Sequence, residues 1–236
     1  MNRLWTLGVA ALVTVAAACG DDDSGPGGVA LFTDTLHFDY DTASTGSEAS
    51  ELEHTIRSFG INIIPIPDVD SATIAGALRN TRILIIPESF SSFNAAVTAP
   101  VLRAMIRDWV DSTGGLLIIN HNATNRLVLD SLFGYTLATG VTGDRYFLDA
   151  ADAAGTPLAN GPGTIWDVSA VTELAAASLP AGTLSIYATA GGDLTVGLVP
   201  QGNGRVLLLG WDWFDAHPFG IQDGGWIEVL QLALKL

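Results

Sequence analysis

The stretch from residue 81 to 122 constrains the fold more than any other part of this 236-residue chain. A short apolar run at residues 82–87 ends in a proline, and a second run at residues 116–119 follows the pair Gly114-Gly115. Between them, apolar residues recur at helical spacing over residues 101–110. Continuous apolar runs are typical of strands buried on both faces. The stretch therefore predicts a β-α-β unit, in which two parallel strands are joined by a right-handed crossover.

Polar side chains follow both strands of this unit. Glu88 comes directly after the first strand, and Asn120, His121 and Asn122 follow the second. Ligands bind at the carboxyl ends of the strands in open α/β sheets, so these four side chains are predicted to lie together at one edge. Amide and imidazole groups could bind a sugar or a carboxylate there, since they offer both donors and acceptors. The alternative is that they cap the next helix and satisfy its turn.

The remaining chain extends the same alternation of strands and helices. Thr45 and Glu48 are predicted to form a capping box at the start of one helix, and Asp70 to cap another. The turn at residues 201–204 lies between two apolar runs and predicts a hairpin, while residues 134–200 are expected to form short strands and loops at the sheet edge. The predicted fold is α/β, a three-layer sandwich with a mainly parallel, flavodoxin-like sheet and an antiparallel hairpin near the C-terminus. The other predicted elements are strands at residues 29–32 and 61–66 and helices at residues 44–60, 70–78, 125–133 and 226–236.

The N-terminus has the order of an export signal. Arg3 precedes an apolar run at residues 4–18, and Cys19, the only cysteine in the chain, comes next. The segment resembles a bacterial lipoprotein signal, which implies that Cys19 is acylated and becomes the first residue of the mature protein. We therefore predict a signal peptide at residues 1–18, a flexible acidic tether at 19–28 and one folded domain at 29–236. The alternative is ordinary signal-peptidase cleavage without a lipid. Gly20 after the cysteine favours delivery to the outer membrane.

The charge of the chain limits its partners. Loss of Arg3 with the signal changes the formal charge from −15 to −16, which argues against binding to nucleic acid or to anionic lipid headgroups. Asp34, Asp39 and Asp41 with His37 could hold a cation, because hard oxygens suit calcium. A solvated acidic loop is the favoured interpretation, and no metal or other cofactor is assigned.

A second polar group occurs late in the chain, where Asp212, Asp215 and His217 lie among Trp211, Trp213 and Phe214. Aromatic rings beside carboxylates are typical of carbohydrate sites. Strand alternation places Asp212 on the face opposite the two tryptophans, and core packing beneath the last helix is the favoured role of Trp211.

Taken together, the run Gly114-Gly115-LLIINHN, the late GRVLLLG arm and the alternating elements resemble the class I glutamine amidotransferase-like superfamily, and its trehalose-utilisation-like branch most closely. The resemblance covers residues 29–236 and implies a nucleophilic cysteine on the turn that here carries Asn120, His121 and Asn122. His217 lies where the family has its histidine, but Phe219 replaces the glutamate beyond it. Glutamine hydrolysis through a thioester is not expected, because that mechanism needs a thiolate and the domain has no cysteine.

These observations favour binding over catalysis. The chain is predicted to be a lipoprotein of the bacterial envelope, held to the membrane by the lipid on Cys19, with a non-catalytic domain that binds a small, carbohydrate-like ligand or a protein partner. The alternative is a hydrolase of glycosides or esters that uses Asp212, Asp215 or His217 as a general base. The candidate ligand-binding residues are Glu88, Asn120, His121, Asn122, Asp212, Asp215 and His217.

Overall fold

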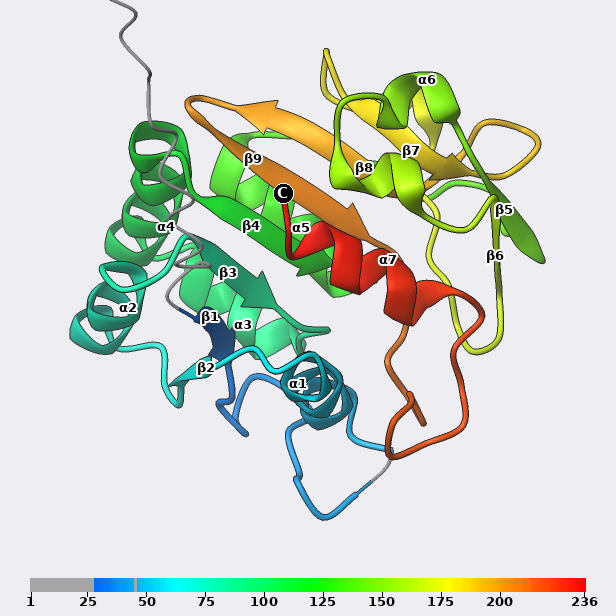
Figure 1. The fold of residues 1–236 in the computed structure, drawn as a ribbon. Coiled ribbons are helices and arrows are strands. Elements are labelled where there is room, and N and C mark those ends of the chain that lie inside the picture. Colours follow the sequence, from blue (N-terminus) through cyan, green and yellow to red (C-terminus); the bar gives the residue numbers. More distant parts are fainter. Residues whose placement is uncertain (1–27, 45) are drawn as a thin grey trace, which may run out of the picture.

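A computed structural model describes residues 28–44 and 46–236 of the chain, so the predicted signal peptide and Cys19 lie outside the described residues. The described part contains one mixed sheet (Figure 1). Its strands are β1 (Val29–Phe32), β2 (Ile63–Ile66), β3 (Ile83–Ile86), β4 (Leu116–Asn120), β5 (Arg145–Leu148), β6 (Thr164–Trp166), β7 (Leu184–Ala188), β8 (Leu194–Gln201) and β9 (Gly204–Leu209), in the order β2-β1-β3-β4-β9-β8-β7-β5-β6. The α-helices are α1 (Glu48–Ser58), α2 (Ser71–Leu78), α3 (Ser91–Val97), α4 (Pro100–Thr113), α5 (Ala123–Phe133), α6 (Ala150–Ala153) and α7 (Trp226–Ala233).

The predicted β-α-β unit is confirmed. Strands β3 and β4 are parallel, with Ile83 opposite Leu116, and α4 crosses between them. Gly114 ends α4 in the left-handed conformation at φ 79°, which a glycine adopts without steric cost. Helix α3 was not predicted, because the segment between the first strand of this unit and its helix lacks a long apolar period.

The sheet is mixed rather than mainly parallel. The pairs β1-β2, β1-β3, β3-β4 and β4-β9 are parallel, whereas β8-β9, β7-β8, β5-β7 and β5-β6 are antiparallel. The predicted hairpin is confirmed as β8-β9, and Gly202 at its turn has a φ of 57°, as a primed turn requires. The expected short strands at residues 134–200 join this hairpin as β5, β6 and β7, so the antiparallel part extends well beyond one hairpin.

Helix α1 begins later than the predicted capping box requires. Its N-cap is Ser47, so Glu48 is the first helical residue and cannot be the third, as a box with Thr45 would need. The Ser47 hydroxyl makes no capping bond; it accepts from the Asp41 amide at 2.7 Å and donates to the Asp39 carbonyl at 2.8 Å. These two bonds fasten the preceding loop to the start of the helix. The predicted cap of α2 is confirmed, since the Asp70 carboxylate accepts from the amides of Ala72 and Thr73.

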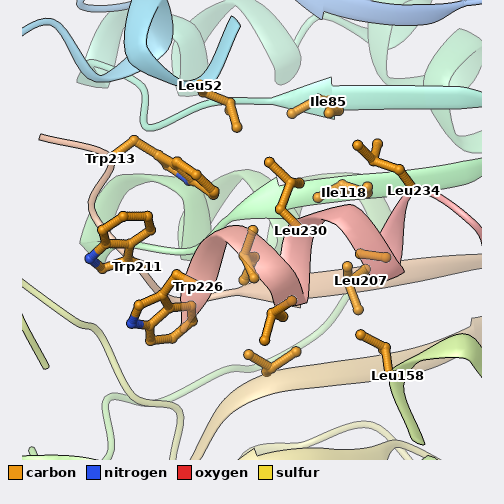
Figure 2. Close-up of a cluster of buried hydrophobic side chains, with 14 of the residues drawn as sticks. Leu52, Ile85, Ile118, Leu158, Leu207, Trp211, Trp213, Trp226, Leu230 and Leu234 are labelled. Carbon is orange, nitrogen blue, oxygen red and sulfur yellow. The ribbon is translucent and has the colours of Figure 1, made fainter. Parts of the chain in front are cut away.

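Alternate residues of the central strands belong to two different hydrophobic clusters. Val29 and Leu31 pack with α1 and α7, whereas Ala30 and Phe32 pack with α2, α3, α4 and α5. The first cluster holds Trp211, Trp213 and Trp226, which lie around one end of α7 in Figure 2. Trp211 is 1% exposed and stacks on Trp226 with ring centroids 5.8 Å apart, which confirms its predicted core role. Among the helices of residues 28–44 and 46–236, none has the length and apolar character needed to cross a bilayer.

Candidate functional site

Three acidic side chains meet where the parallel strands end. Glu88 follows β3, Asp212 follows β9, and Glu48 opens α1. The Glu48 carboxyl is hydrogen-bonded to those of Asp212 and Glu88. Asn122, the N-cap of α5, is close enough to Glu88 to lower its pKa, and the pairing of Ile86 with Ile119 places Glu88 beside the end of β4. We call Glu48, Glu88, Asn122 and Asp212 the carboxyl edge.

Burial raises the pKa of each of these three acids. Burial, followed by the charges of Glu88, Asp212 and Asp39, raises the pKa of Glu48 from 4.5 to about 9. Burial is also the main cause of the raised pKa values of Glu88 and Asp212. None of the ion pairs within the described part of the chain includes these three acids. At neutral pH Glu48 therefore carries a proton that it can donate, while its neighbours accept.

Backbone and aromatic groups fix the geometry around Asp212. Its Oδ1 accepts from the Phe214 amide at 2.7 Å, and the Ser169 hydroxyl lies 3.5 Å from its Oδ2. The Phe214 ring lies against Gly46, where an added Cβ would come within 2.9 Å of the ring. Because the Phe214 side chain is 50% exposed, it offers an apolar face at the rim of the carboxyl edge.

Asn120 and His121 lie behind this edge, within the core. The Asn120 amide donates to the Trp211 carbonyl at 3.0 Å, and His121 Nε2 lies 3.0 Å from the Thr195 carbonyl oxygen. Burial lowers the pKa of His121 from 6.5 to about 4, so its imidazole is neutral at physiological pH. The two side chains join the end of β4 to β8 and to the segment that follows β9.

The structure places Asp215 and His217 in a loop that packs on α1. The His217 carbonyl accepts from the Thr55 hydroxyl at 2.8 Å, and the Asp215 carbonyl accepts from the Gln222 amide at 2.9 Å. The Phe219 ring stacks on His54 of α1, with ring centroids 4.0 Å apart. Within residues 28–44 and 46–236, no hydrogen bond joins the side chain of Asp215 or His217 to the carboxyl edge. These two residues thus belong to a second, adjoining surface.

The acidic loop after β1 differs from the predicted solvated loop. Asp34 and His37 are 8% and 6% exposed, and Asp34 Oδ2 lies 2.9 Å from His37 Nδ1. The other carboxylate oxygen of Asp34 accepts from the Leu36 amide at 2.8 Å. Both oxygens that could bind a cation are therefore already bonded within the local turn. Asp41 is exposed and Asp39 faces Glu48. Over the residues that the structure describes, no group of three or more His, Cys, Asp or Glu side chains is arranged to hold a metal ion.

Glu48 is a member of the site that was not predicted from the sequence. Its assignment to a capping box gave it a local role, and nothing in the spacing to Glu88 or Asp212 links the three along the chain. A usable signal was Ser47, a better N-cap residue adjacent to an acid, which would have placed Glu48 in the first turn of the helix and near the strand ends.

The chain matches no protein-family model and no curated protein. Solved structures do match it. Cytoplasmic Protein STM1381 from Salmonella typhimurium LT2 has a TM-score of 0.59 at 14% identity, over 87% of this chain and 98% of that one. Cytoplasmic Protein STM3548 from Salmonella typhimurium has a TM-score of 0.52 at 13% identity, over 80% of this chain and 86% of that one. A protein from Bacteroides uniformis described as ThuA-like has a TM-score of 0.49 at 13% identity, over 89% and 91%. At these identities, the first two similarities show that the chain shares the α/β fold of those proteins.

Proposed function

We propose that this protein binds a small, hydroxyl-rich ligand at the carboxyl edge and does not transform it. The observation that carries the proposal is the cluster of Glu48, Glu88 and Asp212, which holds three acids together without a cationic partner among the described ion pairs. Such an arrangement costs stability, and strongly perturbed acids of this kind concentrate at functional sites. Buried acids lose their hydrogen bonds to water. A ligand that supplies hydrogen bonds in their place would offset that cost.

The protonation of the cluster suits hydroxyl groups. A sugar hydroxyl both donates and accepts, and the cluster offers a donor at Glu48 and acceptors at Glu88 and Asp212. The Asn122 amide adds a further polar group, and the half-exposed Phe214 ring adds an apolar face against which a sugar ring can pack. The carboxyl ends of parallel strands are also the usual ligand edge of such sheets.

The proposed ancestry is a class I glutamine amidotransferase-like domain of the trehalose-utilisation-like branch, with a three-layer, flavodoxin-like core. The two hydrophobic clusters on alternate residues of the central strands support this layering. Asn120 to Asn122 occupy the turn after β4, and Cys19 is the only cysteine in the chain, so the thiolate chemistry of that superfamily has no candidate nucleophile in the domain.

We further propose that Cys19 carries the lipid that holds the domain to the bacterial envelope, with outer-membrane delivery favoured by Gly20. The Cys19→Ser chain is then expected to lose incorporated palmitate label and to shift from the membrane to the soluble fraction of cells. Several acyl chains anchor a protein far more firmly than one, so this shift should be nearly complete. A Cys19→Ser chain that stays in the membrane fraction with an unchanged mass would contradict the anchor.

The binding proposal is tested by a thermal-shift screen of neutral sugars, amino acids and divalent ions on residues 28–236. A sugar present at 100 times its Kd should stabilise the protein by about 2.7 kcal/mol. Glu48→Gln and Asp212→Asn are expected to weaken that effect, because each changes the pattern of donors and acceptors. Asp108→Asn is the control, since Asp108 is an exposed residue of α4 outside the carboxyl edge. Stabilisation by no sugar, or equal stabilisation of all variants, would contradict the proposal.

A hydrolase is the second candidate, and one observation favours it. A carboxylic acid with a pKa of about 9 next to Asp212 is able to act as a general acid at neutral pH. Against a glycosidase, Glu48 and Asp212 share a hydrogen bond, whereas paired glycosidase carboxyls are about 5 Å apart or more. Turnover of an aryl glycoside or ester that both Glu48→Gln and Asp212→Asn abolish would establish catalysis and displace the binding proposal.

A further inference from the structure

A groove of about 1240 Å³ lies at the opposite edge of the sheet, where β3, β4 and β9 begin. This edge adjoins α2 and α4 in Figure 1. Four basic side chains line the groove, and its lining contains no Asp or Glu. The full chain has only 10 Lys and Arg against 25 Asp and Glu, so this concentration of basic residues reverses the charge of the molecule locally. We call it the cationic groove; its basic residues are Arg79, Arg82, Arg205 and Lys235.

The strand register places the backbones of Arg82 and Arg205 on either side of Gly115, and strand alternation directs their side chains to opposite faces of the sheet, at the end where the groove lies. The Arg82 carbonyl accepts from the Leu116 amide at 2.9 Å, and the Arg205 amide donates to the Gly115 carbonyl at 3.1 Å. Arg82 and Arg205 therefore flank Gly115, about 10 Å apart across two strand spacings. A Cβ on Gly115 would come within 2.6 Å of the Trp109 ring, so that ring covers Gly115 and forms part of the groove wall.

Only two of the four basic residues in the groove can be explained by their position at the end of a helix. Arg79 caps the end of α2 and Lys235 follows the end of α7, where cations stabilise the helix dipole. Arg82 and Arg205 instead precede or begin strands and have no such role. Arg205 donates to a main-chain oxygen of Leu236, and none of the ion pairs in the described residues includes any of the four cations. The Leu236 oxygen offsets part of the Arg205 charge, whereas Arg79, Arg82 and Lys235 have no acidic partner among the described ion pairs, so the groove keeps a net positive charge.

We propose that the cationic groove binds the phosphate headgroups of an anionic phospholipid bilayer. Guanidinium groups bind phosphate oxygens in a bidentate manner. Leu78, Met105 and Trp109 line the same groove and offer apolar contacts to the glycerol and upper acyl region. The carboxyl edge lies at the other ends of the same strands, so headgroup binding turns the ligand site away from the bilayer.

The position of the groove in the chain supports a membrane as its occupant. This support depends on the proposed lipid anchor at Cys19. The Gly28 carbonyl accepts from the hydroxyl of Thr81, a residue that lines the groove, so the chain enters the domain at this edge. Residues 20–27 span at most about 30 Å even when fully extended, so the anchor would keep the groove near the bilayer.

The negative charge of the whole chain does not prevent this contact. The Debye length is about 8 Å at physiological ionic strength, so acids on distant faces of the domain are largely screened from the bilayer. The groove cations would lie within that distance of the headgroups. Overall charge predicted repulsion from anionic lipid, whereas the local arrangement of the basic residues predicts attraction.

The test is co-sedimentation of residues 20–236 with vesicles made of equal parts of phosphatidylglycerol and phosphatidylcholine. This fragment keeps every described helix and strand but lacks Cys19, so its result does not depend on acylation. The fragment is expected to bind these vesicles and not pure phosphatidylcholine. Arg82→Gln/Arg205→Gln should lower the partition coefficient about 10- to 30-fold. Arg82→Lys/Arg205→Lys should retain most of the binding, which separates lost charge from misfolding.

Arg57→Gln/Arg145→Gln removes the same charge elsewhere and serves as the matched control, with binding expected to match that of the parent fragment. Equal binding by both Gln double variants would contradict the proposal, as would no binding to the anionic vesicles. Stabilisation by inorganic phosphate without vesicle binding would also overturn it, and would assign the groove to a soluble phosphate. Because the anchor is tested separately by Cys19→Ser, failure of one proposal is distinguishable from failure of the other.

Discussion

Replacing Glu48 with glutamine is expected to stabilise the protein by about 1 to 3 kcal/mol at pH 8 while changing its stability little near pH 4.5. The folded state raises the pKa of Glu48 from 4.5 to about 9, so the folded carboxyl keeps a proton that the unfolded chain has lost. Folding then takes up a proton, and the stability of the wild-type protein falls as the pH rises from 4.5 towards 9. Glutamine is neutral at every pH and can still donate to Glu88 or Asp212, so the variant escapes this loss.

Urea unfolding of both proteins across this pH range measures the effect. Burial also raises the pKa values of Glu88 and Asp212, so some loss of stability with rising pH should persist in the variant. Asp108→Asn, at an exposed position of α4, should follow the wild-type curve. Parallel curves for wild type and Glu48→Gln would mean that Glu48 titrates normally, and the proposed cluster would then be wrong.

Trp226→Ala is expected to cost about 3 to 5 kcal/mol, the largest loss of stability that we predict for a single residue. Trp226 is fully buried at the start of α7, stacks on Trp211 and donates from its indole nitrogen to the Trp166 carbonyl at 2.8 Å (Figure 2). Alanine would leave a cavity between α7 and the sheet and would free the Trp166 carbonyl. Denaturant unfolding monitored by circular dichroism measures the change.

The same substitution should also weaken ligand binding. Trp211 and Trp213 flank Asp212, so loosening their packing displaces a member of the carboxyl edge. Trp226→Phe keeps an aromatic ring and is the milder control, expected to cost less than alanine in both measurements. A loss below about 1 kcal/mol for Trp226→Ala would show that the cluster tolerates a cavity and does not support the site in this way.

Much of the sheet could be predicted because its strands carry their signals locally. The continuous apolar runs that became β3 and β4 and the turn at Gly202 each specify an element without reference to distant residues. Strand alternation also separated Asp212 from Trp211 and Trp213, and both tryptophans are 1% exposed. The pairing of β7, β5 and β6 was harder to predict from the sequence. It depends on contacts among segments of residues 134–200 that have little hydrophobic periodicity.

The candidate site was only partly predictable for the same reason. Glu88 and Asn122 follow strands, so the sheet topology brings them together. Asn120 and His121 share that position in the chain but face the core, where carbonyl partners hold them, and adjacency alone cannot separate the two orientations. Glu48 comes from a helix whose start depends on loop contacts of Ser47. The cationic groove could not be predicted from the net charge, because that value sums the charges on all faces of the molecule and does not show where they lie.

The most direct test of the central claim, that Glu48, Glu88 and Asp212 form one ligand site, is an NMR titration of the side-chain carboxyl carbons with and without the sugar that stabilises the protein most. We expect that Glu48 titrates near pH 9 and that the sugar shifts the resonances of all three carboxyls more than those of other acids. A Glu48 resonance that titrates near pH 4.5, with sugar-induced shifts confined to other residues, would contradict it.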